Sequence, residues 1–381
     1  MKANNKNILI IAGEASGDLH GSALITELKK IDPSVNVFGI GGEKMKNAGM
    51  NILYPIDKLA FLGFAEVIKH IPFIKRVQRE ILTLVKEKEI SNAVLIDYPG
   101  FNLSLAKKLK AAGVNIFYYI APQIWAWGAG RIKKIKALVN KMIVVFPFEE
   151  ELYRKNNVNV EFVGHPILER INEYELLPKD EFYNIFNLDL NKNILLIFPG
   201  SRKNEISRIF PDAIKAASKL SKEFNLQTVV ACADNIDINL FNGLGIDTEY
   251  KIIKGHNYDL MNLAKIGIIK SGTSTLEAGL FSLPMVIVYK TSLLTYLIIK
   301  KLIKLDIIGM VNIIIGEKVA PELIQDKADD ENIYLECKKI LSDNNLYLSM
   351  KSRLSVLKEK LGQQGASRKA ALIVYSGLNG L

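Results

Sequence analysis

Four polar side chains follow an apolar run near the start of the chain and alternate with small or apolar residues between two glycines. Between Gly13 and Gly21 they are Glu14, Ser16, Asp18 and His20. Open α/β sheets bind their ligands at the carboxyl ends of strands, so this stretch predicts a polar wall of a substrate site. An ordinary turn from a strand into a helix would account for the same residues.

A single carboxylate, Asp97, follows the apolar run at 93–96 and precedes Tyr98, Pro99 and Gly100. Partial burial at the end of a strand would raise the pKa of this carboxyl and suit it to take a proton from a sugar hydroxyl. The local sequence is equally compatible with a second function for Asp97, as the cap of the following turn or helix.

The second half of the chain has two turns suited to phosphate. After the apolar run at 194–198, Pro199 and Gly200 are followed by Ser201 and Arg202, a layout in which a guanidinium can grip a phosphate. A solvated arginine in a capped turn is the alternative.

The other turn joins the run at 266–270 to an expected helix. Its small residues are Gly272, Thr273, Ser274 and Thr275. Free backbone N–H groups at such a helix start favour a pyrophosphate, and Glu277, one turn further on, can accept hydrogen bonds from a ribose diol. Thr273 or Ser274 capping the helix, with Glu277 completing a capping box, is the simpler interpretation, and the two are compatible.

Both tryptophans lie in one loop, where Gln123 precedes Trp125 and Trp127. Such aromatic rings suit sugar faces or acyl chains, although core packing is their commoner use. No complete Gly-x-Gly-x-x-Gly fingerprint and no P-loop lysine motif occurs, which disfavours hydride transfer and ATP hydrolysis.

Alternating apolar runs and helix-period segments must position these residues. The runs expected as strands are 8–12, 36–40, 93–96, 115–120, 141–146, 160–163, 194–198, 227–232, 266–270 and 284–289. This order predicts an α/β chain with two Rossmann-like parallel sheets facing a central cleft. We expect domains at 1–168 and 193–355, a linker at 169–192, and a C-terminal helix at about 356–381 that packs back on the first domain.

The 381 residues carry a formal charge of +10, which calls for an acidic partner such as a phosphorylated metabolite, an anionic membrane or nucleic acid. No nucleic-acid-binding module is recognisable, so we expect no such partner. The two cysteines, Cys232 and Cys337, lack metal-ligand spacing, and we expect no metal site and no disulfide framework. Without a signal peptide or a long apolar span, the chain is expected to be cytoplasmic.

One apolar stretch with basic residues around it predicts contact with an anionic membrane surface. Its apolar residues are Phe61, Leu62, Phe64, Val67, Ile68, Ile71 and Phe73, and its basic residues are Lys58, Lys69, Lys75, Arg76 and Arg79. A buried core helix with a solvated basic face is the alternative. A second stretch, at 291–304, suits a membrane or a partner subunit in a homodimer equally well.

Seven short strings in this order closely resemble the lipid A disaccharide synthases, inverting glycosyltransferases of the GT-B fold. They are GEASGD with HG after it, IDYPGFN, APQIWAWG, FVGHP, PGSR, SGTSTLE and GMVNII. The resemblance implies transfer from UDP-2,3-diacylglucosamine to the 6-hydroxyl of 2,3-diacylglucosamine 1-phosphate, a step of lipid A biosynthesis at the cytoplasmic face of the inner membrane. It implies no cofactor.

Carried over to this chain, the resemblance makes Asp97 the general base, places Arg202, Glu277 and Asn312 around UDP, and places Ser16 on the acceptor side. Tyr98, Gly100 and His20 depart from residues common in the family, and we assign His20 no catalytic task. Two rival functions remain: another UDP-sugar enzyme such as an epimerase, and a non-catalytic nucleotide-binding or lipid-carrier protein in which Asp97 would be dispensable.

Overall fold

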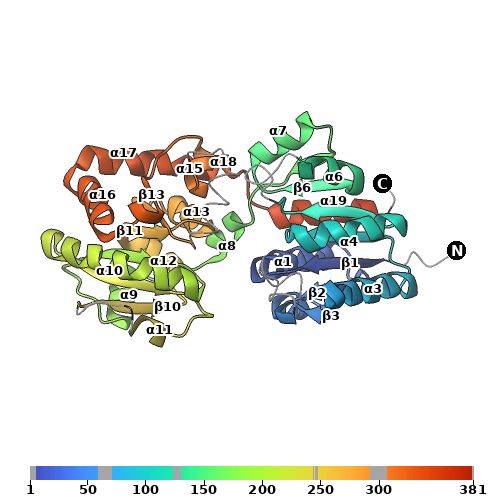
Figure 1. Cartoon of the computed structure of the whole chain (residues 1–381), viewed down its shortest axis with the longest axis horizontal. Helices are drawn as coiled ribbons and strands as arrows, with labels where there is room; N and C mark the ends of the chain where they lie inside the picture. Colours follow the sequence, from blue (N-terminus) through green and yellow to red (C-terminus); the bar gives the residue numbers. More distant parts are fainter. Residues whose placement is uncertain are drawn as a thin grey trace. The chain divides into compact units, whose positions relative to one another are not determined.

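The computed structural model describes residues 6–58, 71–122, 130–242, 244, 248–291 and 307–379. The chain forms two compact units, coloured along the sequence in Figure 1. Unit 1 comprises Met1–Glu169 and Leu361–Leu381, and unit 2 comprises Arg170–Lys360.

Unit 1 contains a seven-stranded sheet in which the described strands pair in parallel, in the order β3-β2-β1-β4-β5-β6-β7. The strands are β1 (Asn7–Ala12), β2 (Asn36–Gly41), β3 (Met50–Pro55), β4 (Asn92–Ile96), β5 (Asn115–Tyr119), β6 (Lys141–Val144) and β7 (Val160–Phe162). Every residue of β1 and β4 is buried, as expected for central strands whose two faces are both covered.

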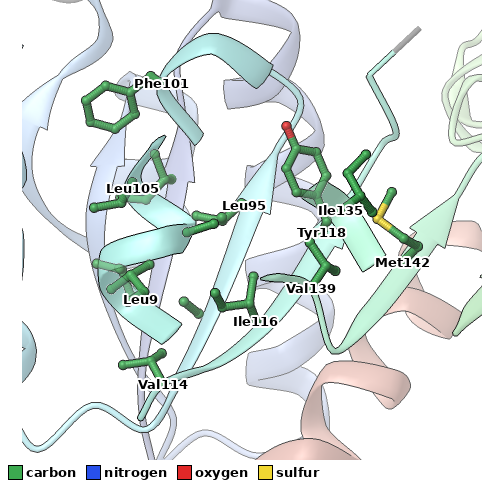
Figure 2. Close-up of a cluster of buried hydrophobic side chains, with 14 of the residues drawn as sticks. Leu9, Leu95, Phe101, Leu105, Val114, Ile116, Tyr118, Ile135, Val139 and Met142 are labelled. Carbon is green, nitrogen blue, oxygen red and sulfur yellow. The ribbon is translucent and has the colours of Figure 1, made fainter. Parts of the chain in front are cut away.

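Helices cover this sheet and complete its core. They are α1 (Ala15–Ile31), α2 (Glu43–Asn47), η1 (Ile56–Lys58), α3 (Ile71–Glu87), α4 (Pro99–Ala111), α6 (Gly130–Leu138), α7 (Pro147–Lys155), α8 (Ile167–Glu173), which runs across the unit boundary, and α19 (Ala366–Leu378). Figure 2 shows one cluster, in which Leu9 and Leu95 of the sheet pack with Phe101 and Leu105 of α4 and Ile135 of α6. The C-terminal helix α19 packs against α1, far from it in sequence.

Unit 2 repeats the pattern with a six-stranded parallel sheet in the order β10-β9-β8-β11-β12-β13. The strands are β8 (Asn193–Phe198), β9 (Leu226–Cys232), β10 (Lys251–Lys254), β11 (Ala264–Lys270), β12 (Met285–Tyr289) and β13 (Glu322–Ile324). The helices are α9 (Lys179–Ile185), α10 (Lys203–Phe224), α11 (Asn239–Asn242), α12 (Asn257–Leu263), α13 (Thr273–Leu280), α15 (Met310–Ile315), η2 (Gln325–Lys327), α16 (Asp330–Ser342), α17 (Asn344–Ser355) and α18 (Leu357–Lys360).

The expected parallel sheets are confirmed, but residues 170–192, expected as a linker, are part of unit 2. They form the end of α8 and all of α9, whose Phe182 and Tyr183 are buried. The stretch is polar and acidic overall, and for this reason the sequence did not indicate that these two aromatic side chains pack into unit 2.

The membrane-contact candidates Phe61, Leu62, Phe64, Val67 and Ile68 lie outside the described residues.

The other two membrane-contact candidates, Ile71 and Phe73, lie at the start of α3 and are described. Ile71 is 41% exposed. Phe73 is half-buried, with its ring edge-on to Tyr54 at 6.1 Å and the Arg76 guanidinium 5.4 Å from its ring centre. No helix among the described residues has the length and apolarity needed to span a membrane.

Both sheets reverse their strand order at a central pair of neighbours. In unit 1 the pair is β1 and β4, with Ala12 opposite Ile96, and in unit 2 it is β8 and β11, with Phe198 opposite Ile269. Doubly wound sheets bind ligands beyond the carboxyl ends of strands at such a switch point. The turns at Gly13 and Asp97, and those at Ser201 and Gly272, begin at these two places.

Candidate active site

Asp97 is the first residue beyond β4, and its backbone is held in an unusual conformation. Asp97 and Tyr98 have φ angles of 44° and 45°, in the left-handed region that residues other than glycine rarely adopt. Tyr98, rather than Asp97, occupies the N-cap position of α4, and no side chain caps the helix there. The alternative function of Asp97 as a helix cap is therefore not what the structure shows.

The surroundings of Asp97 raise the pKa of its carboxyl. The pKa of this carboxyl is raised to about 6: burial is the largest cause, the negative charge of Glu14 acts in the same direction, and a hydrogen bond from the Tyr98 backbone opposes them. A carboxylate with this pKa is ionised at pH 7 and is a stronger proton acceptor than an exposed aspartate.

The turn after β1 supplies the neighbours of Asp97. Glu14 is the N-cap residue of α1, and Glu14 and Ser16 are both exposed. Because Ala12 is paired with Ile96, the turns that follow these two residues lie side by side. A Cβ atom on Gly13 would lie 2.3 Å from the ring of Tyr98, so only glycine fits beneath this ring.

Asp18 has a different function from its neighbours. It is 5% exposed, and its carboxylate accepts hydrogen bonds from the backbone N–H groups of Gly42 (2.7 Å), Lys44 (3.2 Å) and Met45 (3.0 Å). Asp18 therefore caps α2, and its carboxylate is occupied by these backbone groups rather than presented to an acceptor. Gln123 and Trp125, the other acceptor-side candidates, lie outside the described residues.

In unit 2, Arg202 stands at the N-cap of α10 with a side chain that is 72% exposed. Glu205 lies between two cations, with its Oε1 2.9 Å from Lys270 Nζ and 3.9 Å from Arg202 Nη1. Its Oε2 accepts a hydrogen bond from the Ser201 N–H at 3.3 Å. Sequence reasoning missed Lys270 and Glu205, which meet because β8 and β11 are neighbours.

The helix start at Gly272 is open. Gly272 is the N-cap of α13, has φ 152°, and provides no side-chain cap. The Ser274 hydroxyl donates to the Lys270 carbonyl at 2.9 Å and the Thr275 hydroxyl to the Gly272 carbonyl at 2.8 Å, while Thr273 is exposed. The alternative capping box does not form, because the N-cap is Gly272 and Glu277 contacts Arg170 and Tyr258 instead.

Glu277 lies in a cavity of about 180 Å³ lined by Arg170, Tyr174, Gly255, Asn257, Tyr258 and Glu277. Its Oε1 is 3.4 Å from Arg170 Nη2 and accepts a hydrogen bond from the Tyr258 hydroxyl at 3.3 Å. Burial raises the pKa of Glu277, and these two partners oppose that shift. No feature of the local sequence marked Arg170, Asn257 or Tyr258.

Two buried polar atoms of this cavity's residues have no hydrogen-bond partner among the described residues. They are Arg170 Nε, a donor, and Asn257 Oδ1, an acceptor. Buried polar groups are normally satisfied, and a ligand that fills the cavity would satisfy them. Across the described chain, no group of three or more His, Cys, Asp or Glu residues is placed to hold a metal ion.

Residues 8–375 match a protein-family model described as lipid-A-disaccharide synthetase. The chain belongs to this family. It is similar to lipid-A-disaccharide synthases of Geobacter sulfurreducens, with 41% identity over 97% of both chains, and of Syntrophus aciditrophicus, with 38% identity over 98% of both. The chain is accordingly a glycosyltransferase that makes the lipid A disaccharide.

Solved structures are similar in fold at low identity. A UDP-GlcNAc 2-epimerase from Neisseria meningitidis has a TM-score of 0.65 and 12% identity, with 98% of this chain and 100% of that chain covered. A glycosyltransferase from Rickettsia africae has a TM-score of 0.61 and 12% identity, with 99% of each chain covered. The expected GT-B fold with two Rossmann-like domains is confirmed, and this likeness shows the fold alone.

Asn312 is the residue that only the family resemblance had marked, and it is fully buried. Its Nδ2 donates to the Ala320 carbonyl at 2.8 Å and to Glu322 Oε1 at 2.7 Å, while its Oδ1 accepts from the N–H groups of Val319 (2.9 Å) and Ala320 (3.0 Å). All of its hydrogen-bonding capacity is used within unit 2. In this structure Asn312 fixes the chain between α15 and β13 and has no group left for UDP.

Proposed function

We propose that the chain transfers 2,3-diacylglucosamine from UDP-2,3-diacylglucosamine to the 6-hydroxyl of 2,3-diacylglucosamine 1-phosphate with inversion. The acceptor oxygen forms a bond to C1 of the donor sugar, the bond from C1 to the UDP oxygen breaks, and UDP leaves. Asp97 takes the proton of the attacking hydroxyl. Membership of the lipid-A-disaccharide synthetase family supports these substrates.

The observation that carries the assignment of Asp97 is its backbone and burial at the switch point of unit 1. A left-handed backbone at an aspartate costs conformational free energy, and burial of its carboxyl costs desolvation free energy. A carboxylate whose pKa is raised to about 6 is useful for general-base catalysis. Glu14 and Ser16, exposed on the neighbouring turn, are proposed to line the acceptor's position.

We assign the pyrophosphate of UDP to the switch point of unit 2. Arg202 presents an exposed guanidinium there, and the start of α13 at Gly272, Thr273 and Ser274 offers backbone N–H groups and a favourable dipole. Ser201 and Thr275 complete these two turns. This arrangement stabilises the negative charge that develops on departing UDP.

We propose the cavity at Glu277 as the site for the nucleoside half of UDP. Arg170 Nε can donate to a carbonyl oxygen of uracil, and Asn257 Oδ1 can accept from the uracil N–H, which satisfies both unpartnered atoms. The two bonds that Glu277 already makes are to Oε1, so Oε2 is the oxygen proposed to accept from the ribose hydroxyls.

Acylated substrates reside in a membrane, and we propose peripheral binding to the anionic cytoplasmic face of the inner membrane. Exposed Ile71 and the Phe73–Arg76 pair at the start of α3 support this, since apolar and basic groups are combined there. The second apolar stretch, at 291–304, lies outside the described residues from 292 onward, and we propose that it contacts either the membrane or a partner subunit.

The donor and acceptor requirement tests the proposed reaction. UDP release is expected only when the acylated UDP-sugar and the acylated sugar phosphate are both present in detergent micelles. Equal turnover with UDP-N-acetylglucosamine as donor would contradict the acylated donor and leave a general UDP-sugar transferase.

Replacing Asp97 tests the base. Asp97→Asn keeps the shape of the side chain but cannot accept the proton, so kcat is expected to fall at least about 100-fold. The affinity for UDP, measured by calorimetry, is expected to stay within about twofold because UDP is assigned to unit 2. A variant with wild-type kcat would remove Asp97 from the mechanism.

A further inference from the structure

The position of Asp97 is determined by groups that do not touch its carboxylate. Two successive residues, Asp97 and Tyr98, have left-handed backbones, a conformation that persists only where the surroundings enforce it. The backbone conformation at Asp97 sets the direction in which its side chain leaves β4. Whatever holds this backbone therefore also aims the base.

Two fully buried side chains supply that restraint. Asn102, in the first turns of α4, donates through Nδ2 to the carbonyl of Asp97 at 2.7 Å and to that of Ile96 at 3.1 Å. The Tyr118 hydroxyl, from β5, donates to the same Asp97 carbonyl at 2.6 Å. The Asp97 N–H donates to the Tyr119 carbonyl at 3.1 Å, so both the N–H and the carbonyl of Asp97 are hydrogen-bonded.

Both donors are held by contacts of their own. The Asn102 N–H bonds to the Tyr98 carbonyl at 3.1 Å, which joins Asn102 to the turn it restrains. The Tyr118 ring packs in the apolar cluster with Leu95, Ile135 and Met142, and its hydroxyl lies at the edge of that cluster (Figure 2). Burial raises the pKa of Tyr118 well above its usual range, so the hydroxyl keeps its proton and remains a donor.

We propose that Asn102 and Tyr118 are positioning residues that hold Asp97 in its left-handed conformation, through the Asp97 main-chain carbonyl, and so aim its carboxylate at the acceptor hydroxyl. This inference rests on the proposed function of Asp97 as the base. It adds two residues, from α4 and from β5, that act on the reaction through the backbone.

Tyr118→Phe and Tyr153→Phe form a matched pair of variants. Tyr153 is also fully buried in the core of unit 1, but its hydroxyl has no partner among the described residues. Tyr118→Phe is expected to lower kcat about 10-fold, the factor for one lost hydrogen bond, with KM for both substrates within about twofold. Tyr153→Phe is expected to keep the wild-type kcat.

Asn102→Ala removes both bonds of the amide and is expected to lower kcat about 100-fold. It is also expected to move the acidic limb of the kcat profile to lower pH, because a released carboxylate gains solvent and its pKa falls from about 6. A purely structural effect would lower the amount of folded enzyme without moving this limb.

The double variant Asp97→Asn/Tyr118→Phe completes the test. If Tyr118 acts through Asp97, the double variant has the kcat of Asp97→Asn alone. A further 10-fold loss, or equal kcat values for Tyr118→Phe and Tyr153→Phe, would overturn the inference. A fully active Asp97→Asn enzyme would instead overturn the proposed base, which separates the two failures.

Discussion

At the scale of single residues, the two carboxylates beside β1 and β4 interact through their charges. Burial is the larger cause of the raised pKa of Asp97, and the charge of Glu14 adds to it. Glu14 is exposed, so its effect is screened by solvent and salt more than that of a buried group. The ionisation of Asp97 is therefore adjustable from a residue on the neighbouring turn.

Glu14→Gln is expected to extend activity to lower pH. The base works only when ionised, so kcat falls as pH drops through the pKa of about 6, and loss of the Glu14 charge lowers that pKa. The kcat profile from pH 4.5 to 8 measures the shift, with Glu87→Gln, an exposed carboxylate at the end of α3, as the control. An unmoved or upward-shifted acidic limb would contradict the charge interaction.

Residues in the turns after strands were predictable, because the end of an apolar run is visible in the sequence. Asp97, Arg202 and the turn at Gly272 belong to this class. The sequence did not distinguish Asp18 from Glu14, since both stand in one alternating stretch and only the fold brings Gly42 and Met45 to Asp18.

At the scale of elements, β3, β10 and β13 were not predicted, and all three are edge strands of their sheets. An edge strand has one neighbour and needs fewer apolar residues, so Lys251–Lys254 and Glu322–Ile324 lack the apolar run that marks β1 or β8. The central strands determine where the switch points lie, and they were predictable because both of their faces are buried and their sequences are continuous apolar runs.

Arg170 and Asn257 were not predictable as site residues, because the cavity that they share depends on long-range packing of α8 and α12.

Asn312→Ala is expected to destabilise unit 2 rather than to remove a UDP contact. Four hydrogen bonds are lost, and buried backbone groups of Val319 and Ala320 lose their partner, a cost of about 3 kcal/mol. Faster hydrogen exchange in α15 and β13 would report this loss. Arg202→Gln is the comparison variant: it is expected to weaken UDP binding and to leave hydrogen exchange in α15 and β13 at the wild-type rate.

The alternative outcome for Asn312 is equally measurable. If its amide contacts UDP directly, Asn312→Ala would weaken UDP binding by 10-fold or more while exchange in α15 stayed at the wild-type rate. Calorimetry with UDP and exchange on the same sample distinguish the two functions.

At the scale of the whole molecule, the chain leaves unit 1 after Glu169 and returns to it at Leu361. The return is fixed by specific contacts: the Ser367 N–H and hydroxyl bond to the two Glu169 oxygens at 2.9 and 2.7 Å, and the Tyr375 hydroxyl bonds to Asp32 at 3.0 Å. Unit 1 is therefore complete only when the C-terminal segment has been made, whereas all of unit 2 precedes that segment.

A chain that ends at Lys360 is expected to lose unit 1 and keep unit 2. The missing segment includes α19, whose Ala366, Ala370, Ala371 and Val374 are fully buried, and burying a valine alone contributes about 2 kcal/mol. Amide hydrogen exchange should become fast in α1, β4 and β5. The shortened chain should lose its turnover but should still bind UDP. Tyr375→Phe, which removes only the hydroxyl next to Asp32, is the mild control and should keep both units folded. Protected amides throughout β4 and β5 of the shortened chain would contradict this dependence, and lost UDP binding would contradict the assignment of UDP to unit 2.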